Sequence, residues 1–250
     1  KDYDKIVKEL SDFQRKNGGK TFLPERKVNA EILLNHLHTT GWMFKLFLTM
    51  GILLIPAMKL KEKHPKALKI LHKCFLTIIV ICASLLTAVL SLRWYVGGHF
   101  PMSNGYETMQ TLALMIMLGT LVIGRKHVLF ASLGMLTAGF ALLVSSLSEM
   151  NPQITHLMPV LSSPLLSIHV SSIMASYAML SLTFFIAVGA LARPSATEES
   201  MRLIYLILYP ALTLLTIGIF VGAVWANVSW GTYWSWDPKE VWALITMLIY

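Results

Sequence analysis

Long runs of apolar residues constrain this chain more than any other feature of its sequence. Each run approaches the ~20 residues that an α-helix needs to cross the hydrocarbon core of a bilayer. Because lipid offers no partner to backbone N–H and C=O groups, a segment inside it must satisfy those groups as a helix. Of the 250 residues, 55% are hydrophobic and 14% are charged, whereas soluble domains carry about 25% charged residues. The sequence therefore predicts an all-α fold, a polytopic transmembrane helical bundle, and excludes a large soluble core.

The apolar runs predict six complete spans and a partial seventh. We place them at residues 42–58, 74–96, 107–124, 128–147, 169–192 and 203–224, with the partial one from residue 239. From Pro238 to Tyr250 a helix would extend only about 20 Å, which is less than the ~30 Å hydrocarbon core. We therefore expect the chain to be a piece of a longer membrane protein, with part of its site absent.

Residues 1–41 are polar and precede the first span. Apolar side chains between Ile6 and Phe13 share one helical face, and Asn17-Gly18-Gly19 is typical of a helix end. A second amphipathic stretch follows Pro24. We expect these residues to form an extracytoplasmic or interfacial segment, followed by a membrane domain over residues 42–250.

The distribution of charge predicts the topology. Alternate loops carry lysine and arginine: 59–73, 124–127 and 192–202. The loops between them carry neither: 97–106, 148–168 and 225–238. By the positive-inside rule the first set is cytoplasmic and the second extracytoplasmic. The net charge of +8 is thus a topology signal rather than a sign of nucleic-acid binding. We expect an integral membrane protein.

Five of the seven tryptophans lie in one predicted loop, from Trp225 to Trp242. An interfacial aromatic belt is the alternative explanation, but belts spread one or two rings over each helix end. Packed indoles would bind a large planar apolar ligand, and heme has that form. Gly231 would let backbone or ligand approach closely. The candidate platform comprises Trp225, Trp230, Gly231, Tyr233, Trp234, Trp236, Asp237 and Trp242.

The end of this segment, Asp237-Pro238-Lys239-Glu240, is typical of a helix start. Asp237 suits the N-cap, Pro238 suits the first helical position, and Glu240 suits the third, where it completes a capping box. We therefore expect Asp237 and Glu240 to be structural rather than catalytic, and to fix the angle at which the last helix begins.

Heme iron takes a histidine ligand, and His169 is the best placed on the same side of the membrane. It opens the predicted span 169–192. An ordinary interfacial histidine is the alternative on position alone. The turn before the third span adds Arg93, His99 and Glu107 as further candidates on that side, since an arginine could pair with a heme propionate. A role confined to stabilising the turn is the alternative for all three.

These segments together resemble the tryptophan-rich "WWD" family of heme-handling proteins in cytochrome c biogenesis. Trp230-Gly-Thr-Tyr-Trp-Ser-Trp-Asp-Pro-Lys-Glu-Val-Trp242 carries the likeness. Its Pro-Lys-Glu-x-Trp part is similar to the CcsA (ResC) type of system II cytochrome c synthase. The blocks Gly98–Glu107 and Leu166–Val170 resemble the same type. The stretch Glu31–Asn35 resembles the end of the partner CcsB (ResB) portion of fused synthases.

The resemblance implies a cytochrome c heme lyase that takes heme b as its substrate and attaches it to apocytochrome c. The thiols of a Cys-x-x-Cys-His segment would add to the heme vinyl groups on the extracytoplasmic face. It implies that His169 is one axial ligand and that a second lies beyond Tyr250. It also implies apocytochrome c and a CcsB-like portion as partners, and a bacterial inner (plasma) membrane or a thylakoid as the location. A heme transporter or presentation module without lyase activity, and a scaffold that docks apocytochrome, are the alternatives.

Overall fold

The structure is a computed structural model that describes residues 2–19, 24–37, 39–58, 63–147, 150, 152–154, 161, 163–192 and 197–250. This part of the chain is helical and contains no strand. Its helices are α1 (Asp2–Asn17), α2 (Glu25–His36), α3 (Thr39–Ala57), α5 (Pro65–Gly97), α6 (Gly105–Ile123), α7 (Val128–Ser145), α8 (Pro164–Ala192), α9 (Thr197–Trp230) and α10 (Pro238–Ile249). The predicted all-α bundle is confirmed.

Five helices, α5 to α9, are each long and apolar enough to cross a membrane. α3 meets that criterion only together with α2, from which it is bent by 42°. The bundle thus has five candidate spans, or six if the bent pair counts as one. α10 has 12 residues and is shorter than a span, as predicted for the partial seventh.

Several helices extend beyond the predicted spans. α5 begins at Pro65 rather than at residue 74, so Lys66, Lys69 and Lys73 lie on a helix and not in a loop. α8 begins at Pro164 rather than at His169. The difference arises because hydropathy reports the apolar length, whereas backbone hydrogen bonding continues into polar residues at the helix ends. Residues 59–62 and 193–196, which belong to two of the basic loops, lie outside the described residues.

The main core lies where α3, α5, α6 and α7 meet. Met43, Phe47, Ile79 and Met117 are among its fully buried members. α3 and α7 approach closely because both carry glycine at the contact: a Cβ on Gly51 would lie 2.7 Å from Leu136 Cγ, and one on Gly139 would lie 2.9 Å from Leu48 Cδ2. Small residues commonly allow such close approach between membrane helices.

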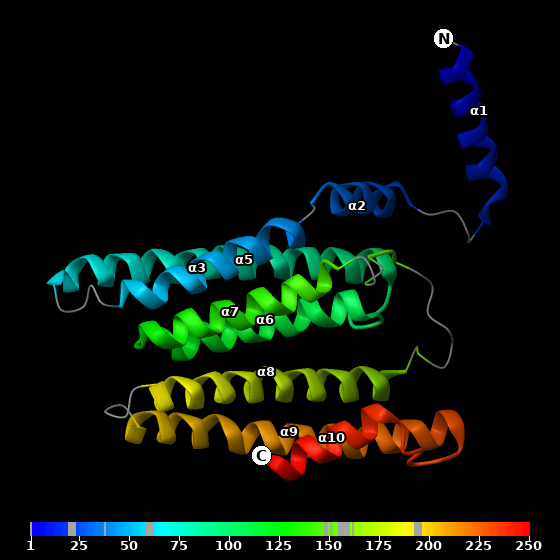
Figure 1. Ribbon diagram of the computed structural model, residues 1–250. Coiled ribbons are helices and arrows are strands. Elements are labelled where there is room, and N and C mark those ends of the chain that lie inside the picture. Colours follow the sequence, from blue (N-terminus) through cyan, green and yellow to red (C-terminus); the bar gives the residue numbers. More distant parts are fainter. Residues whose placement is uncertain are drawn as a thin grey trace.

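α8 and α9 form a second packed pair, with a smaller core of Ile173, Leu180, Ala211 and Leu215. Figure 1 shows α5 to α9 lying beside one another, with consecutive helices antiparallel and α10 folded back along α9. The turn between α5 and α6, the start of α8 and the loop between α9 and α10 therefore lie at the same end of the bundle. α1 projects away from the bundle, while α2 packs against α5.

Candidate functional site

The segment from Trp225 to Trp242 is a helix end, a short loop and a helix start. α9 continues through Trp230, so the prediction of one loop across the whole segment was wrong. Gly231 ends the helix: its φ is +80° and its N–H donates to the carbonyl oxygen of Asn227 at 2.9 Å. Glycine adopts this left-handed conformation without strain. A Cβ on Gly231 would meet no other atom of the described chain within 4 Å, so within the protein the positive φ, and not crowding, is what favours glycine here; close approach of a ligand at Gly231 stays a prediction.

The predicted capping box at the start of α10 is confirmed. One carboxylate oxygen of Asp237 accepts from the N–H groups of Lys239 at 2.7 Å and Glu240 at 2.9 Å. In return Glu240 accepts from the N–H groups of Asp237 at 3.3 Å and Ser235 at 2.9 Å. The two carboxylates therefore hold the loop and the helix start in one geometry.

A cavity of about 820 Å³ opens between α8, the end of α9 and α10. Six platform candidates line it: Trp225, Trp230, Tyr233, Trp234, Asp237 and Trp242. His169 lines it as well, on the α8 side. Cavities that hold small ligands and cofactors span about 300–1,000 Å³. The structure thus brings together the histidine and most of the aromatic residues that the sequence singled out.

His169 lies in the second turn of α8, and its ring is held against α9. Its Nδ1 donates a hydrogen bond to the carbonyl oxygen of Gly218 at 2.7 Å. A carbonyl only accepts, so in the neutral ring the proton lies on Nδ1 and the lone pair on Nε2. Metal-ligating histidines commonly donate their other N–H to a backbone carbonyl in this way.

Two glycines that we did not single out from the sequence position this histidine. A Cβ on Gly222 would lie 2.5 Å from both Cε1 and Nδ1 of His169. One on Gly218 would lie 2.6 Å from Ile173 Cδ1. Together they form Gly218-Ile-Phe-Val-Gly222, the Gly-x-x-x-Gly spacing that lets membrane helices approach. That spacing was the signal available in the sequence.

The indole N–H groups of Trp225 and Trp234 are buried and have no hydrogen-bond partner among the described residues. A buried donor left unpaired costs about 1–3 kcal/mol. Both residues line the cavity, together with Lys239. A ligand with an apolar body and carboxylate groups would offer acceptors to these donors and a counter-ion to the lysine.

Two platform candidates, Gly231 and Trp236, do not line the cavity. Trp236 is 72% exposed. Its ring packs edge-on against Trp234, with centroids 5.9 Å apart. Its φ of 58° is unusual for a bulky side chain and marks local strain.

Arg93 and Glu107 do not line the tryptophan cavity. They pair with each other: Arg93 Nε donates to Glu107 Oε1 at 2.9 Å, with side chains 5% and 1% exposed. The other carboxylate oxygen accepts from the backbone and hydroxyl of Ser103, and Arg93 Nη2 donates to the carbonyl oxygen of Pro152. The pair therefore joins α5 to α6 and to the segment before α8.

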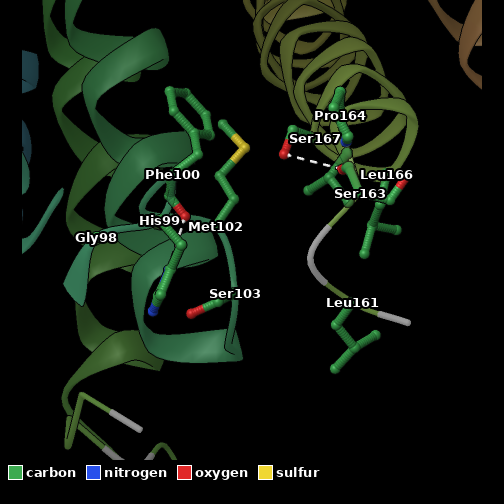
Figure 2. Close-up of a pocket in the computed structure, with 11 residues that line it drawn as sticks. Gly98, His99, Phe100, Met102, Ser103, Leu161, Ser163, Pro164, Leu166 and Ser167 are labelled. Atoms are coloured by element: carbon green, nitrogen blue, oxygen red, sulfur yellow. Dashed lines mark hydrogen bonds between the residues drawn. The ribbon is translucent and has the colours of Figure 1, made fainter. Parts of the chain in front are cut away.

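His99 lines a separate, smaller cavity of about 240 Å³. Figure 2 shows one wall from the turn after α5, with Phe100 and Met102, and the other from the start of α8. Leu161, Leu166 and Val170 line both this cavity and the tryptophan cavity. Nε2 of His99 is buried without a partner among the described residues.

Comparison with known proteins gives the family of the chain. The family described as Cytochrome C assembly protein matches residues 40–250. The chain belongs to the cytochrome c assembly family. The match begins within α3 and covers every residue of the tryptophan cavity, so α1 and α2 precede the shared part.

Individual relatives narrow the family to its CcsA type. Protein NrfI of Wolinella succinogenes is 39% identical over 255 residues, which cover 96% of this chain but 28% of NrfI. Cytochrome c biogenesis protein CcsA of Prochlorococcus marinus (strain AS9601) is 34% identical over 213 residues, 69% of this chain and 68% of that protein. CcsA of Synechococcus sp. (strain CC9902) is 35% identical over 213 residues, 69% of this chain and 70% of that protein. The predicted resemblance to the CcsA type is confirmed.

Proposed function

We propose that this protein holds heme b in the tryptophan cavity and presents it to apocytochrome c for covalent attachment. The observation that carries this proposal is the geometry of His169, whose Nδ1 is held by Gly218 while its other nitrogen is left to ligate iron. Membership of the cytochrome c assembly family supports a heme-related substrate. In the described part of the chain no group of three or more metal-ligating side chains could hold a metal ion by itself. A single axial histidine on a macrocycle fits this better than a protein-only metal centre.

The chemistry of the cavity walls fits the parts of heme. Indole and phenol rings from Trp225, Trp230 and Tyr233 would contact the porphyrin faces and edges. The propionates would accept from the unpaired indole N–H groups and pair with Lys239. Among the described residues that line the cavity, His169 is the only histidine and would be the one to reach the iron. The opposite axial position would then be open to another ligand, such as the histidine of the incoming Cys-x-x-Cys-His segment.

The contribution to bond formation is positioning. In the attachment reaction the S–H of each cysteine adds across one vinyl C=C of heme, so that a C–S bond forms and the hydrogen ends on the neighbouring carbon. Asp237 and Glu240, which line the cavity, are committed to the capping box, and no acid–base role is assigned to them. Holding heme and peptide in a reactive geometry by itself accelerates bond formation greatly. A lyase and a presentation module would both hold heme in this way and would differ only in whether the thioether bond forms on the protein.

The decisive experiment uses the full-length protein purified from heme-replete cells. We expect a Soret band with α and β bands in the wild type, and a loss of bound heme of about tenfold or more in His169→Ala. His64→Ala, at the other end of the bundle, is the matched control because His64 is exposed and should retain heme. Added imidazole should restore the spectrum of His169→Ala if the lost group was an iron ligand.

Heme staining of a co-expressed cytochrome c separates the lyase from the presentation module. A lyase yields a heme that stays attached to the cytochrome polypeptide after denaturation. A heme spectrum without any attached product would favour presentation alone. Wild-type protein without a Soret band would refute both.

A further inference from the structure

A third cavity, of about 620 Å³, lies at the opposite end of the bundle from the tryptophan cavity. Most of its lining comes from the first turns of α5, from the turn between α6 and α7, and from the start of α7, with Met58, Gly189 and Ser200 completing it. In Figure 1 these elements meet at the end where α5, α7 and α9 begin. No part of this cavity is used in the proposed handling of heme.

The lining joins cations to an apolar wall. Lys69, Lys73, Arg125 and Lys126 line the cavity and are exposed. Leu76, Leu129 and Phe130 are among the apolar side chains beside them. Among the described residues no acidic side chain lines this cavity, and no described carboxylate pairs with any of the four cations. Four positive charges that no described carboxylate offsets, at the edge of an apolar cavity, fit an anionic ligand with an apolar part.

The backbone adds to the positive potential. α5 and α7 both begin at this cavity, at Pro65 and Val128, and neither has an acidic residue in its first turn or a side-chain cap at its N-cap. The first N–H groups of each helix are thus open to an anion, and the helix dipole favours negative charge there. His72 is buried and donates from Nε2 to the carbonyl oxygen of Gly124 at 2.8 Å. This bond holds the basic turn against α5.

We propose that this cavity binds the headgroup phosphate of an anionic phospholipid, with the acyl chains along the apolar wall. Basic pockets between membrane helices bind anionic headgroups at cytoplasmic surfaces. The alternative is that these basic residues only set the membrane topology. Topology depends on the number of basic residues in a loop and does not explain why they line a cavity. Lys63 and Lys66 illustrate the difference, because they are exposed at the same end yet do not line the cavity.

The test uses the purified full-length protein in mixed micelles of equal phosphatidylglycerol and phosphatidylcholine, with native mass spectrometry to count the lipid retained. The wild type should retain phosphatidylglycerol preferentially. Lys73→Gln/Lys126→Gln should lower that preference about tenfold, because two cations that line the cavity and would contact the headgroup phosphate directly are lost. Lys63→Gln/Lys66→Gln removes the same charge at the same end and should leave the preference unchanged.

Competitors identify the source of the phosphate. Inorganic phosphate should not displace the retained lipid, because it cannot contact the apolar wall; displacement would make this a free-anion site and overturn the proposal. Displacement by added heme b with a new Soret band would overturn it in favour of a second heme site. Equal losses in the two double variants would also overturn it. A wild-type protein that retains phosphatidylglycerol and phosphatidylcholine equally would also overturn it, and this comparison does not depend on the folding of any variant.

Discussion

The imidazole of His169 donates from Nδ1 to the carbonyl oxygen of Gly218, 2.7 Å away on the neighbouring helix. This bond directs the ring from α8 across the helix interface, against the Cα of Gly222. The ring orientation is therefore a property of the contact between α8 and α9. The same contact forms one wall of the tryptophan cavity.

Gly222→Ala should displace the His169 ring, because the new Cβ would lie 2.5 Å from two ring atoms. We expect bound heme to fall about tenfold or more, the usual effect of disturbing a group that orients a metal ligand. The Soret absorbance of the purified protein measures this loss. Gly41→Ala is the matched control, since its Cβ would meet nothing within 4 Å. Equal retention by the two variants would mean that the ring has no such role.

Asp237→Ala should destabilise the start of α10, because Asp237 caps two backbone N–H groups. Loss of such a cap costs about 0.5–2 kcal/mol, and thermal unfolding in detergent reports it. Asp237→Asn keeps a capping oxygen and should be close to the wild type in both stability and cytochrome c yield. A stable Asp237→Asn protein that makes no cytochrome c would show that the carboxylate acts in the reaction itself.

Arg93→Ala and Glu107→Ala should each lower the free energy of unfolding by about 3–5 kcal/mol, because each leaves a buried charge without its partner. Replacing both residues with leucine should cost less than the two single changes together. Glu9→Ala breaks an ion pair whose side chains are 76% and 69% exposed, so it should cost little. Stable single variants that lose only heme would instead support a role of Arg93 at the propionates.

The charge pattern predicts that the tryptophan loop faces the outside of the cell or the lumen. Single cysteines at Ser235 and Lys126, both exposed, test this in a background lacking Cys74 and Cys82. A membrane-impermeant maleimide should label the Ser235→Cys protein in intact cells or vesicles of native orientation. The Lys126→Cys protein should react only after lysis. The reverse pattern would invert the topology.

Much of the fold was predictable because hydropathy and helix-terminus chemistry are local. The apolar runs predicted the helices from α5 to α9, and the spacing of Asp237 and Glu240 predicted the capping box. Helix lengths were less predictable: α9 reaches Trp230 because helical hydrogen bonding does not stop where the apolar residues do. α1 and α2 lie where helices were expected, whereas the separation of residues 1–41 as a domain remains a prediction.

The sequence by itself determined a helical membrane bundle, with an aromatic segment and a histidine predicted to lie at the same end. Apolar length, loop charge and residue type are local properties that can be read directly from the sequence. Only the tertiary structure decided which side chains contact one another. It paired Arg93 with Glu107, placed His99 in a separate cavity and left Trp236 outside the tryptophan cavity. It also gave Gly218 and Gly222 their role, because the clearance that His169 needs exists only once α8 and α9 are packed together.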